Sequence, residues 1–178
     1  MTVPAEWIIE AAMSIKENNI KRERKNRIVF LDIDGVLNTL RWDAVIDSHH
    51  MHFDKVQLLN RICLEGDANV VIHSAWTKNL DVNIIASILW SHGFDIENIG
   101  ILGTTPKKLT STRYHELPMY FDDPKNGPID AWVILDDWDL RWDEKHLSHP
   151  MFKNSIKTDP GIGLTEELAT QAVLMLNK

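Results

Sequence analysis

The chain has 178 residues, of which 44% are hydrophobic, and it carries a formal net charge of −7. This length allows one sizeable core and leaves little room for a second domain. An acidic chain lacks the electrostatic footprint that accompanies tight binding to duplex nucleic acid, although it does not exclude a local basic groove.

The single cysteine, Cys63, excludes an intramolecular disulfide. It shares a helical face with Val56 and Leu59, so we expect a core residue of a protein from the reducing cytoplasm. No apolar run approaches the roughly 18 to 20 residues that a membrane helix needs. The early acidic residues Glu6 and Glu10 are also untypical of a signal peptide. We therefore expect a soluble, cytoplasmic protein without membrane association.

Residues 1–27 are predicted to form an accessory helix and a basic connector. The helix is expected over residues 4–19, because their apolar side chains share one face. The charged run from Lys21 to Arg27 is more typical of a solvated connector than of a nucleic-acid contact. We assign residues 28–178 to one catalytic domain.

Short apolar runs without alternation predict strands that are buried on both faces of a parallel sheet. They lie at residues 28–31, 68–72 and 131–135, with a weaker run at 96–102. Helical patterns occupy residues 53–64, 81–92, 112–121 and 164–177. This alternation predicts an α/β fold with an open, Rossmann-like, mainly parallel sheet and helices on both faces. Such sheets bind ligands outside the carboxyl ends of their strands.

The first predicted strand ends in two acids spaced by one residue, Asp32 and Asp34, followed by Gly35. Two carboxylates this close repel each other unless a cation lies between them, which favours a hard divalent ion such as Mg²⁺. The glycine permits a sharp turn. An isolated pattern of this kind can be a capped turn, but its place after a buried strand favours a functional site.

The run from Asp32 to Leu37 resembles the first motif of the haloacid dehalogenase-like (HAD) phosphatase superfamily. Ser74, at the end of the second predicted strand, is similar to the second motif. The pair Asp136 and Asp137, after the strand at 131–135, is similar to the fourth. The resemblance implies a HAD-like fold and a Mg²⁺-dependent phosphomonoester hydrolase.

The same resemblance implies roles for these residues. Asp32 would attack phosphorus to form an aspartyl-phosphate, and Asp34 would protonate the leaving oxygen and then activate water. The Asp32 carboxylate and the Asp34 backbone carbonyl would bind Mg²⁺. Asp137 is the expected third ligand, with Asp136 nearby, although the order of the pair could be reversed. Ser74 would hold a phosphoryl oxygen, but a helix cap is a competing role.

The third motif of the superfamily is a basic residue, and the sequence offers Lys107, Lys108 and Arg113 in the right interval. Arg113 is slightly favoured, with Lys108 as its alternative. For Arg113, exposure to solvent or an ion pair with Glu116 is as good an explanation as catalysis. Which residue completes the site is left open.

Histidines and tryptophans in the predicted loops are further candidates for site residues. The stretch His49–His52 has no recognisable zinc-ligand spacing, so surface histidines are favoured over a zinc site. Trp42, Trp76 and Trp138 follow predicted strands and are candidates for an aromatic wall against a base or sugar. Trp132 is expected in the core.

Residues 101–116 and 157–165 resemble the HAD domain of multi-domain RNA repair proteins. The intervals after Asn38 and after Ser74 are too short for a cap domain, which implies an open site. Open sites suit large substrates, so we expect a phosphorylated nucleotide or nucleic-acid end as the partner. The net charge of −7 opposes the approach of such a polyanion.

Two other classes of function compete with the hydrolase. The first is a catalytically silent HAD-like module that binds metal or phosphate and recruits partners, but such a module has no need of Asp34. The second is a receiver-like domain, which would carry its acidic pair after the first strand and its acceptor aspartate later. Here the order is reversed. The oligomeric state is left open.

Overall fold

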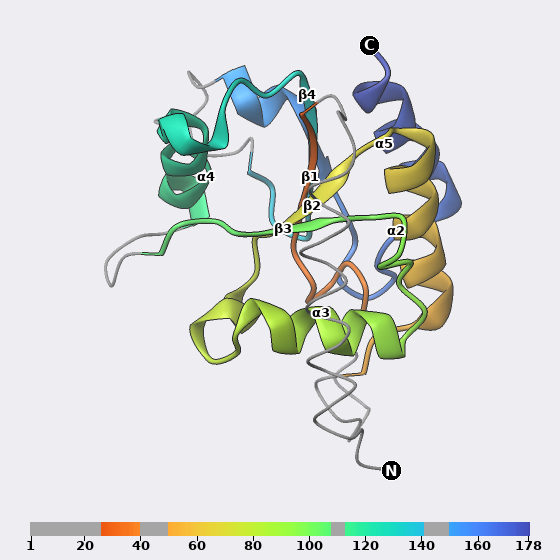
Figure 1. The fold of residues 1–178 in the computed structure, drawn as a ribbon. Helices are drawn as coiled ribbons and strands as arrows, with labels where there is room; N and C mark the ends of the chain where they lie inside the picture. Colours follow the sequence, from red (N-terminus) through yellow and green to blue (C-terminus); the bar gives the residue numbers. More distant parts are fainter. Residues whose placement is uncertain (1–25, 40–49, 108–112, 141–149) are drawn as a thin grey trace.

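A computed structural model describes residues 26–39, 50–107, 113–140 and 150–178 (Figure 1). The predicted N-terminal helix and the candidates Trp42, His49 and Lys108 lie outside the described residues. The strands are β1 (Arg27–Leu31), β2 (Asn69–Ile72), β3 (Ile101–Thr104), β4 (Ala131–Asp136) and β5 (Ser155–Lys157). The α-helices are α2 (Phe53–Glu65), α3 (Val82–Ser91), α4 (Arg113–Asp122) and α5 (Glu166–Leu176). Short 3₁₀ helices are η1 (Ala75–Lys78), η2 (Pro124–Asn126) and η3 (Pro150–Asn154).

The five strands form one sheet in the order β3-β2-β1-β4-β5, and every pairing is parallel. From β1 the chain runs outward to β2 and β3, then returns to β4 on the other side of β1. The direction of winding therefore changes between β1 and β4, and the carboxyl ends of these two strands border the usual ligand crevice of an open α/β sheet. The predicted α/β class is confirmed.

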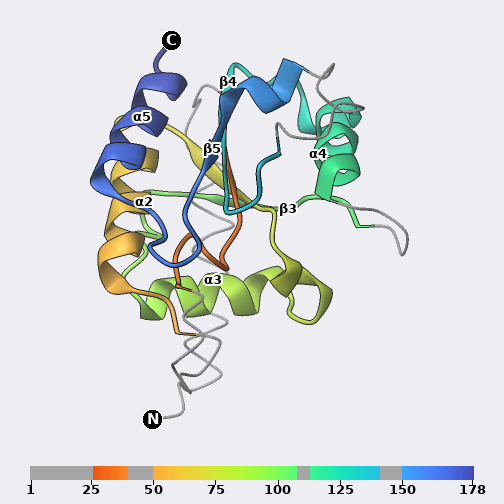
Figure 2. The same cartoon turned by 180° about the vertical axis from the view of Figure 1, so that it is seen from behind.

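Helices cover both faces of the sheet, as predicted (Figures 1 and 2). Along β1, Val29 and Leu31 face the larger core, which α2, α3 and α5 close, while Ile28 and Phe30 face the smaller core under α4. This alternation explains why the strand is apolar without interruption. In the smaller core the rings of Phe30 and Tyr120 pack edge to face, with their centroids 5.2 Å apart.

The third strand begins later than the sequence predicted. Residues 96–98 form a turn instead, and β3 starts at Ile101. The cause is Asp95, whose side chain accepts a hydrogen bond from the backbone N–H of Asn98 at 3.2 Å. Such local side-chain bonds offer the backbone an alternative to a strand. The short strand β5 and the 3₁₀ helices were not predicted.

Several smaller expectations can be compared with the structure. Cys63 is fully buried in the larger core, as predicted. Trp132 packs at the edge of the smaller core. The described residues between β1 and α2, and between β2 and β3, contain turns, η1 and α3 but no cap domain. Within the described ranges, no helix has both the length and the apolar character that crossing a membrane requires.

Candidate active site

Three carboxylates meet where β1 and β4 end. Asp32 follows β1, Asp136 is the last residue of β4, and Asp137 comes next. The strand ends are in register, because the Asp32 N–H donates to the carbonyl of Leu135 at 2.9 Å. Ligand oxygens of the three acids lie within 4.8 Å of one another. Asp32 and Asp136 are fully buried and Asp137 is partly exposed, so the cluster lies at the carboxyl ends of β1 and β4 with one of its acids open to solvent.

Gly35 shapes the turn that follows Asp32. Its φ of +71° lies in the left-handed region, which favours glycine. A Cβ at this position would lie 2.7 Å from Cβ of Asp137 and 2.8 Å from its Oδ2. The turn can therefore approach the acidic pair only because residue 35 has no side chain.

The side chain of Asp34 is not part of the cluster of three acids and contacts the segment after β2 instead. The indole Nε1 of Trp76 donates to both carboxylate oxygens of Asp34, at 3.0 Å to each. The amide Nδ2 of Asn38 donates to Oδ1 of Asp34 at 2.8 Å. The Asn38 amide oxygen in turn accepts from the N–H of Gly35 at 2.9 Å. The side chain of Asp34 is thus held by donors from two segments.

Ser74 lies at the carboxyl end of β2 and is buried. Its Oγ accepts from the N–H of Trp76 at 3.4 Å, so the competing role as a helix cap is realised, although for η1. The helix α3 is capped by Asp81 instead. Lys107, from the loop after β3, donates from Nζ to the carbonyl of Ser74 at 2.5 Å. Of the basic candidates for the third motif, Lys107 is the one whose side chain the structure describes.

Behind the acids lies a group of buried polar residues that the sequence analysis missed. Nδ1 of His73 lies 3.1 Å from Oγ1 of Thr105 and 3.8 Å from Oε2 of Glu116. Nε2 of His73 lies 4.0 Å from Oδ2 of Asp136. The imidazole is therefore placed between two buried acids. The signal was available, because His73 also follows a predicted buried strand.

Thr158, the residue after β5, connects the turn after Asp32 to the end of β4. The N–H of Thr158 donates to the carbonyl of Asp136 at 2.9 Å. Its Oγ1 donates to the carbonyl of Gly35 at 2.7 Å. Thr158 is buried, so each bond forms away from competing water. One residue thereby sets the spacing between the two acidic segments.

The other predicted site residues lie apart from this cluster or outside the part of the chain that the structure describes. Arg113 begins α4, but its side chain is outside the described part of the chain. Trp76 is only 8% exposed and offers little surface for stacking a base, whereas Trp138 is 55% exposed. The ring of His50 contacts that of His92, with centroids 5.5 Å apart. Nε2 of His52 lies 3.2 Å from Oγ1 of Thr39.

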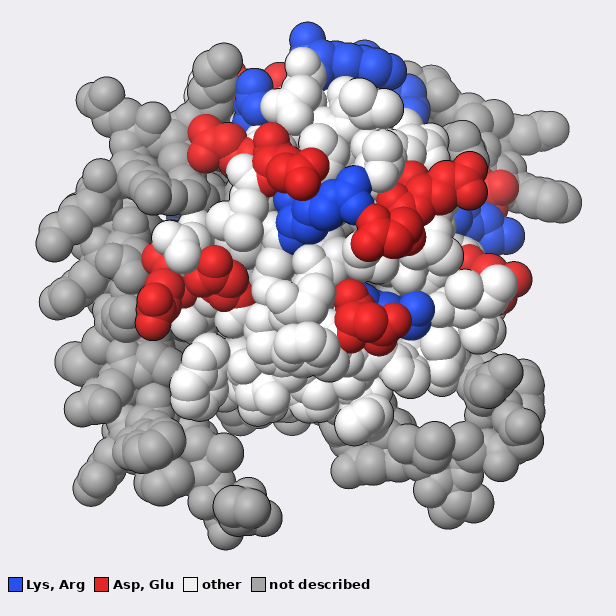
Figure 3. Space-filling view, turned by 90° about the vertical axis from the view of Figure 1, so that its right-hand side faces the viewer, with Lys and Arg blue, Asp and Glu red and all other residues white. Residues whose placement is uncertain are grey.

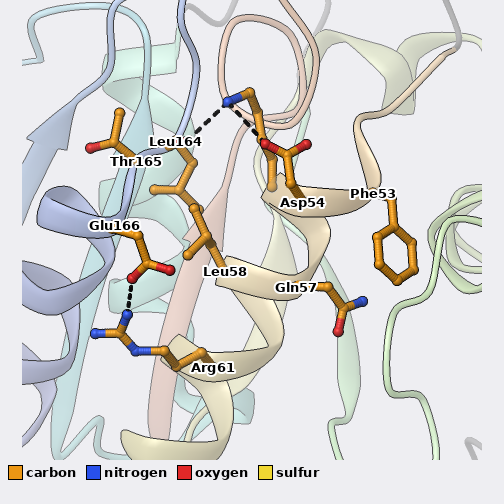
Figure 4. A pocket seen from close by; sticks show the side chains of 9 residues that line it. Phe53, Asp54, Gln57, Leu58, Arg61, Leu164, Thr165 and Glu166 are labelled. Carbon is orange, nitrogen blue, oxygen red and sulfur yellow. Dashed lines mark hydrogen bonds and ion pairs between the residues drawn. The ribbon is translucent and has the colours of Figure 1, made fainter.

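A groove on the molecular surface lies between α2 and the start of α5 (Figure 4). Its walls include Phe53 and Leu58 from α2 and Leu164 from the segment before α5. Arg61 forms an ion pair with Glu166 across it. None of the three clustered acids lines this groove, so we do not assign it to the chemistry at the strand ends.

The face that bears α2 and α5 has both signs of charge. Basic and acidic side chains alternate over its described surface (Figure 3). The contributing pairs include Arg61 with Glu65, at 3.3 Å, and Arg61 with Glu166. Such exposed pairs contribute little to stability. The described residues of this face do not present the continuous basic surface typical of polyanion binding.

The donor atoms of the acidic cluster fit a hard divalent cation. All three groups are carboxylates, two of them without solvent exposure, and carboxylate oxygens are the ligands that Mg²⁺ prefers. Buried like charges at this spacing strongly disfavour one another's ionisation unless a cation compensates them. The backbone N–H of Trp138 donates to Oδ1 of Asp136 at 2.9 Å, and Oδ2 of Asp136 lies 4.0 Å from Nε2 of His73. Asp137 packs against the turn at Gly35.

An aspartate after the first strand and an acidic pair after a later, neighbouring strand match the arrangement that the sequence resemblance to HAD-like domains led us to expect. The family described as "HAD domain in Swiss Army Knife RNA repair proteins" matches residues 28–169, and the chain belongs to this family. Neither a search of curated proteins nor one of solved structures returned a match. Most members of the HAD superfamily are hydrolases, usually phosphatases.

Proposed function

We propose that this protein is a Mg²⁺-dependent phosphomonoester hydrolase that works through an aspartyl-phosphate on Asp32. The observation that carries the proposal is the buried cluster of Asp32, Asp136 and Asp137 at the switch point of the sheet. Mg²⁺ held by these carboxylates would offset their repulsion of a phosphate ester. Family membership supports the same chemistry.

In the proposed reaction, a carboxylate oxygen of Asp32 forms a bond to phosphorus while the bond from phosphorus to the leaving oxygen breaks. Asp34 gives its proton to that leaving oxygen. In the second half, Asp34 takes a proton from a water molecule, which attacks the aspartyl-phosphate. Inorganic phosphate leaves, and both aspartates return to their first state. Ser74 is proposed to orient a phosphoryl oxygen.

We propose Lys107 as the basic residue that offsets the charge of the phosphoryl group. Its ammonium group lies 2.5 Å from the carbonyl of Ser74, which places it at the carboxyl edge of β2, next to β1. Lys107→Met should therefore lower kcat/KM for phosphate esters by about 100- to 1,000-fold, the range for loss of one group that stabilises transition-state charge.

The matched control for Lys107→Met is Lys125→Met. Lys125 is exposed in η2, which precedes β4, whereas the acidic cluster lies at the other end of β4. It should keep wild-type kinetics. Steady-state assays of both variants with an aryl phosphate check the prediction. Equal kinetics of the two variants would return Lys108 and Arg113 to first place as candidates for the third motif.

We further propose a phosphorylated nucleotide or polynucleotide end as the substrate. The described connections hold no cap domain, so the site can accept an end of a large molecule. The name of the family associates its members with RNA repair. The net charge of −7 predicts weak, salt-sensitive contacts with the rest of a polynucleotide, so recognition should concentrate on the terminal phosphate.

A phosphate-release screen tests the proposed function. The full chain is assayed in Mg²⁺ and in EDTA with an aryl phosphate, mononucleotides, and oligonucleotides phosphorylated at the 5′ or the 3′ end. We expect release that EDTA abolishes and Mg²⁺ restores, with preference for a nucleotide end. A folded protein that binds Mg²⁺ but releases phosphate from none of these esters would support the non-catalytic binding module instead.

A further inference from the structure

The backbone of Trp76 is hydrogen-bonded at both its N–H and its carbonyl. Its backbone N–H donates to Oγ of Ser74 at 3.4 Å, and its carbonyl accepts from Asn79 at 3.0 Å and from Leu80 at 2.9 Å. The residue is 8% exposed and belongs to the larger core. The ring is therefore held in place from the backbone outward.

The polar end of this ring is directed at Asp34. An indole has one N–H, and here it lies 3.0 Å from each oxygen of the same carboxylate. That shared geometry centres the carboxylate on the N–H bond. Asn38 adds a donor at 2.8 Å to one of the oxygens, so the carboxylate is held against rotation as well as displacement.

A second tryptophan shows what a purely structural indole does in this fold. Trp132 packs at the edge of the smaller core, and its Nε1 donates to the backbone carbonyl of Met151 at 2.9 Å. Both side chains have their N–H hydrogen-bonded, as buried indoles usually do. Of these two tryptophans, Trp76 is the one that donates to an acid of the first motif, Asp34, three residues after the end of β1.

We propose that Trp76 is a positioning residue that holds Asp34 in place for proton transfer to the leaving oxygen. This inference rests on the proposed function, because it assigns Asp34 the role of general acid. Trp76 follows Ser74 by two residues, so a single 3₁₀ turn links the phosphoryl-binding serine to the orientation of the acid. A proton donor acts efficiently only within hydrogen-bond reach of the atom that receives the proton.

The test compares Trp76→Phe with Trp132→Phe, each of which removes an indole N–H and keeps an aromatic ring. The kcat/KM of each variant is measured with 2,4-dinitrophenyl phosphate, whose leaving group needs little protonation, and with an alkyl phosphate, whose leaving group needs it fully. Trp76→Phe should lose about 10- to 100-fold with the alkyl phosphate and much less with the dinitrophenyl ester. Trp132→Phe should show no such difference between the esters.

A second measurement leaves Trp76 unchanged and so does not depend on the folding of its variant. In ¹⁵N-labelled protein, Asp34→Asn should shift the indole N–H resonance of Trp76 and leave that of Trp132 in place. Equal losses on both esters in Trp76→Phe, or an unmoved Trp76 resonance in Asp34→Asn, would overturn the positioning role. Failure of the proposed function is distinguishable, because it appears as absent phosphate release in the wild type.

Discussion

Asp32→Asn should abolish phosphate release, with a loss on the order of 10⁴-fold or more, as expected when a covalent nucleophile is removed. Asparagine keeps the size of the side chain. It also keeps the backbone hydrogen bond that the N–H of the fully buried residue 32 donates to the carbonyl of Leu135. The fold should therefore persist. Single-turnover assays, with mass spectrometry of the peptide that contains Asp32, check both the rate and the covalent phosphoryl group.

Asp136→Asn is the matched control for this prediction. It removes one charge from the same buried cluster but, in the proposed reaction, no nucleophile. Raised Mg²⁺ concentration should restore part of its activity, because its defect is in cation binding, and should restore none to Asp32→Asn. If the two variants responded alike to Mg²⁺, Asp32 would be a ligand only, and the aspartyl-phosphate route would be wrong.

The sequence predicted the sheet well where strands are buried on both faces. The runs that became β1 and β4 are apolar without a break, because each alternates between two cores. The strand β5 was not predicted because it is short and lies at the edge of the sheet. It has three residues, Ser155–Lys157, and pairs only with β4 at the edge of the sheet (Figure 2). Such a segment carries too little pattern to distinguish it from a loop.

The acids of the candidate site were predictable because strand ends place them. Asp32 and Asp136 follow from the rule that parallel strands gather their carboxyl ends at one edge of the sheet. The structure brings these two residues together with Asp137. Their catalytic and metal-binding roles stay predictions, as do those of Asp34 and Ser74.

The surroundings of the acids could not be predicted from local pattern. The sequence pattern suggests Glu116 as a partner for Arg113 within one helix, yet Glu116 is buried beside His73. Thr158 is far along the chain from Gly35, which it contacts. Each of these contacts joins segments that meet only after the sheet has formed. Spacing along the chain therefore carries no signal for them.

Gly35→Ala should disrupt the site as well as the fold. The added Cβ would meet Asp137 at 2.7 Å, and φ of +71° disfavours alanine. The neighbouring bonds, from the Gly35 N–H to Asn38 and from Thr158 to the Gly35 carbonyl, restrict any relief of the contact. We expect a loss of about 1–3 kcal/mol in unfolding free energy from the strained backbone. Displacement of Asp137 should also lower kcat/KM by about 100-fold.

Gly127→Ala separates these two effects. Gly127 has φ of 64° and ψ of −177°, a conformation that glycine almost alone adopts, but a Cβ there would meet nothing within 4 Å. It should therefore lose stability in urea unfolding while keeping the Mg²⁺ affinity and kinetics of the folded wild type. Gly35→Ala should lose all three. A Gly35→Ala protein that kept Mg²⁺ affinity and turnover would show that Asp137 can move freely, and so is not the ligand that the close approach to Gly35 positions.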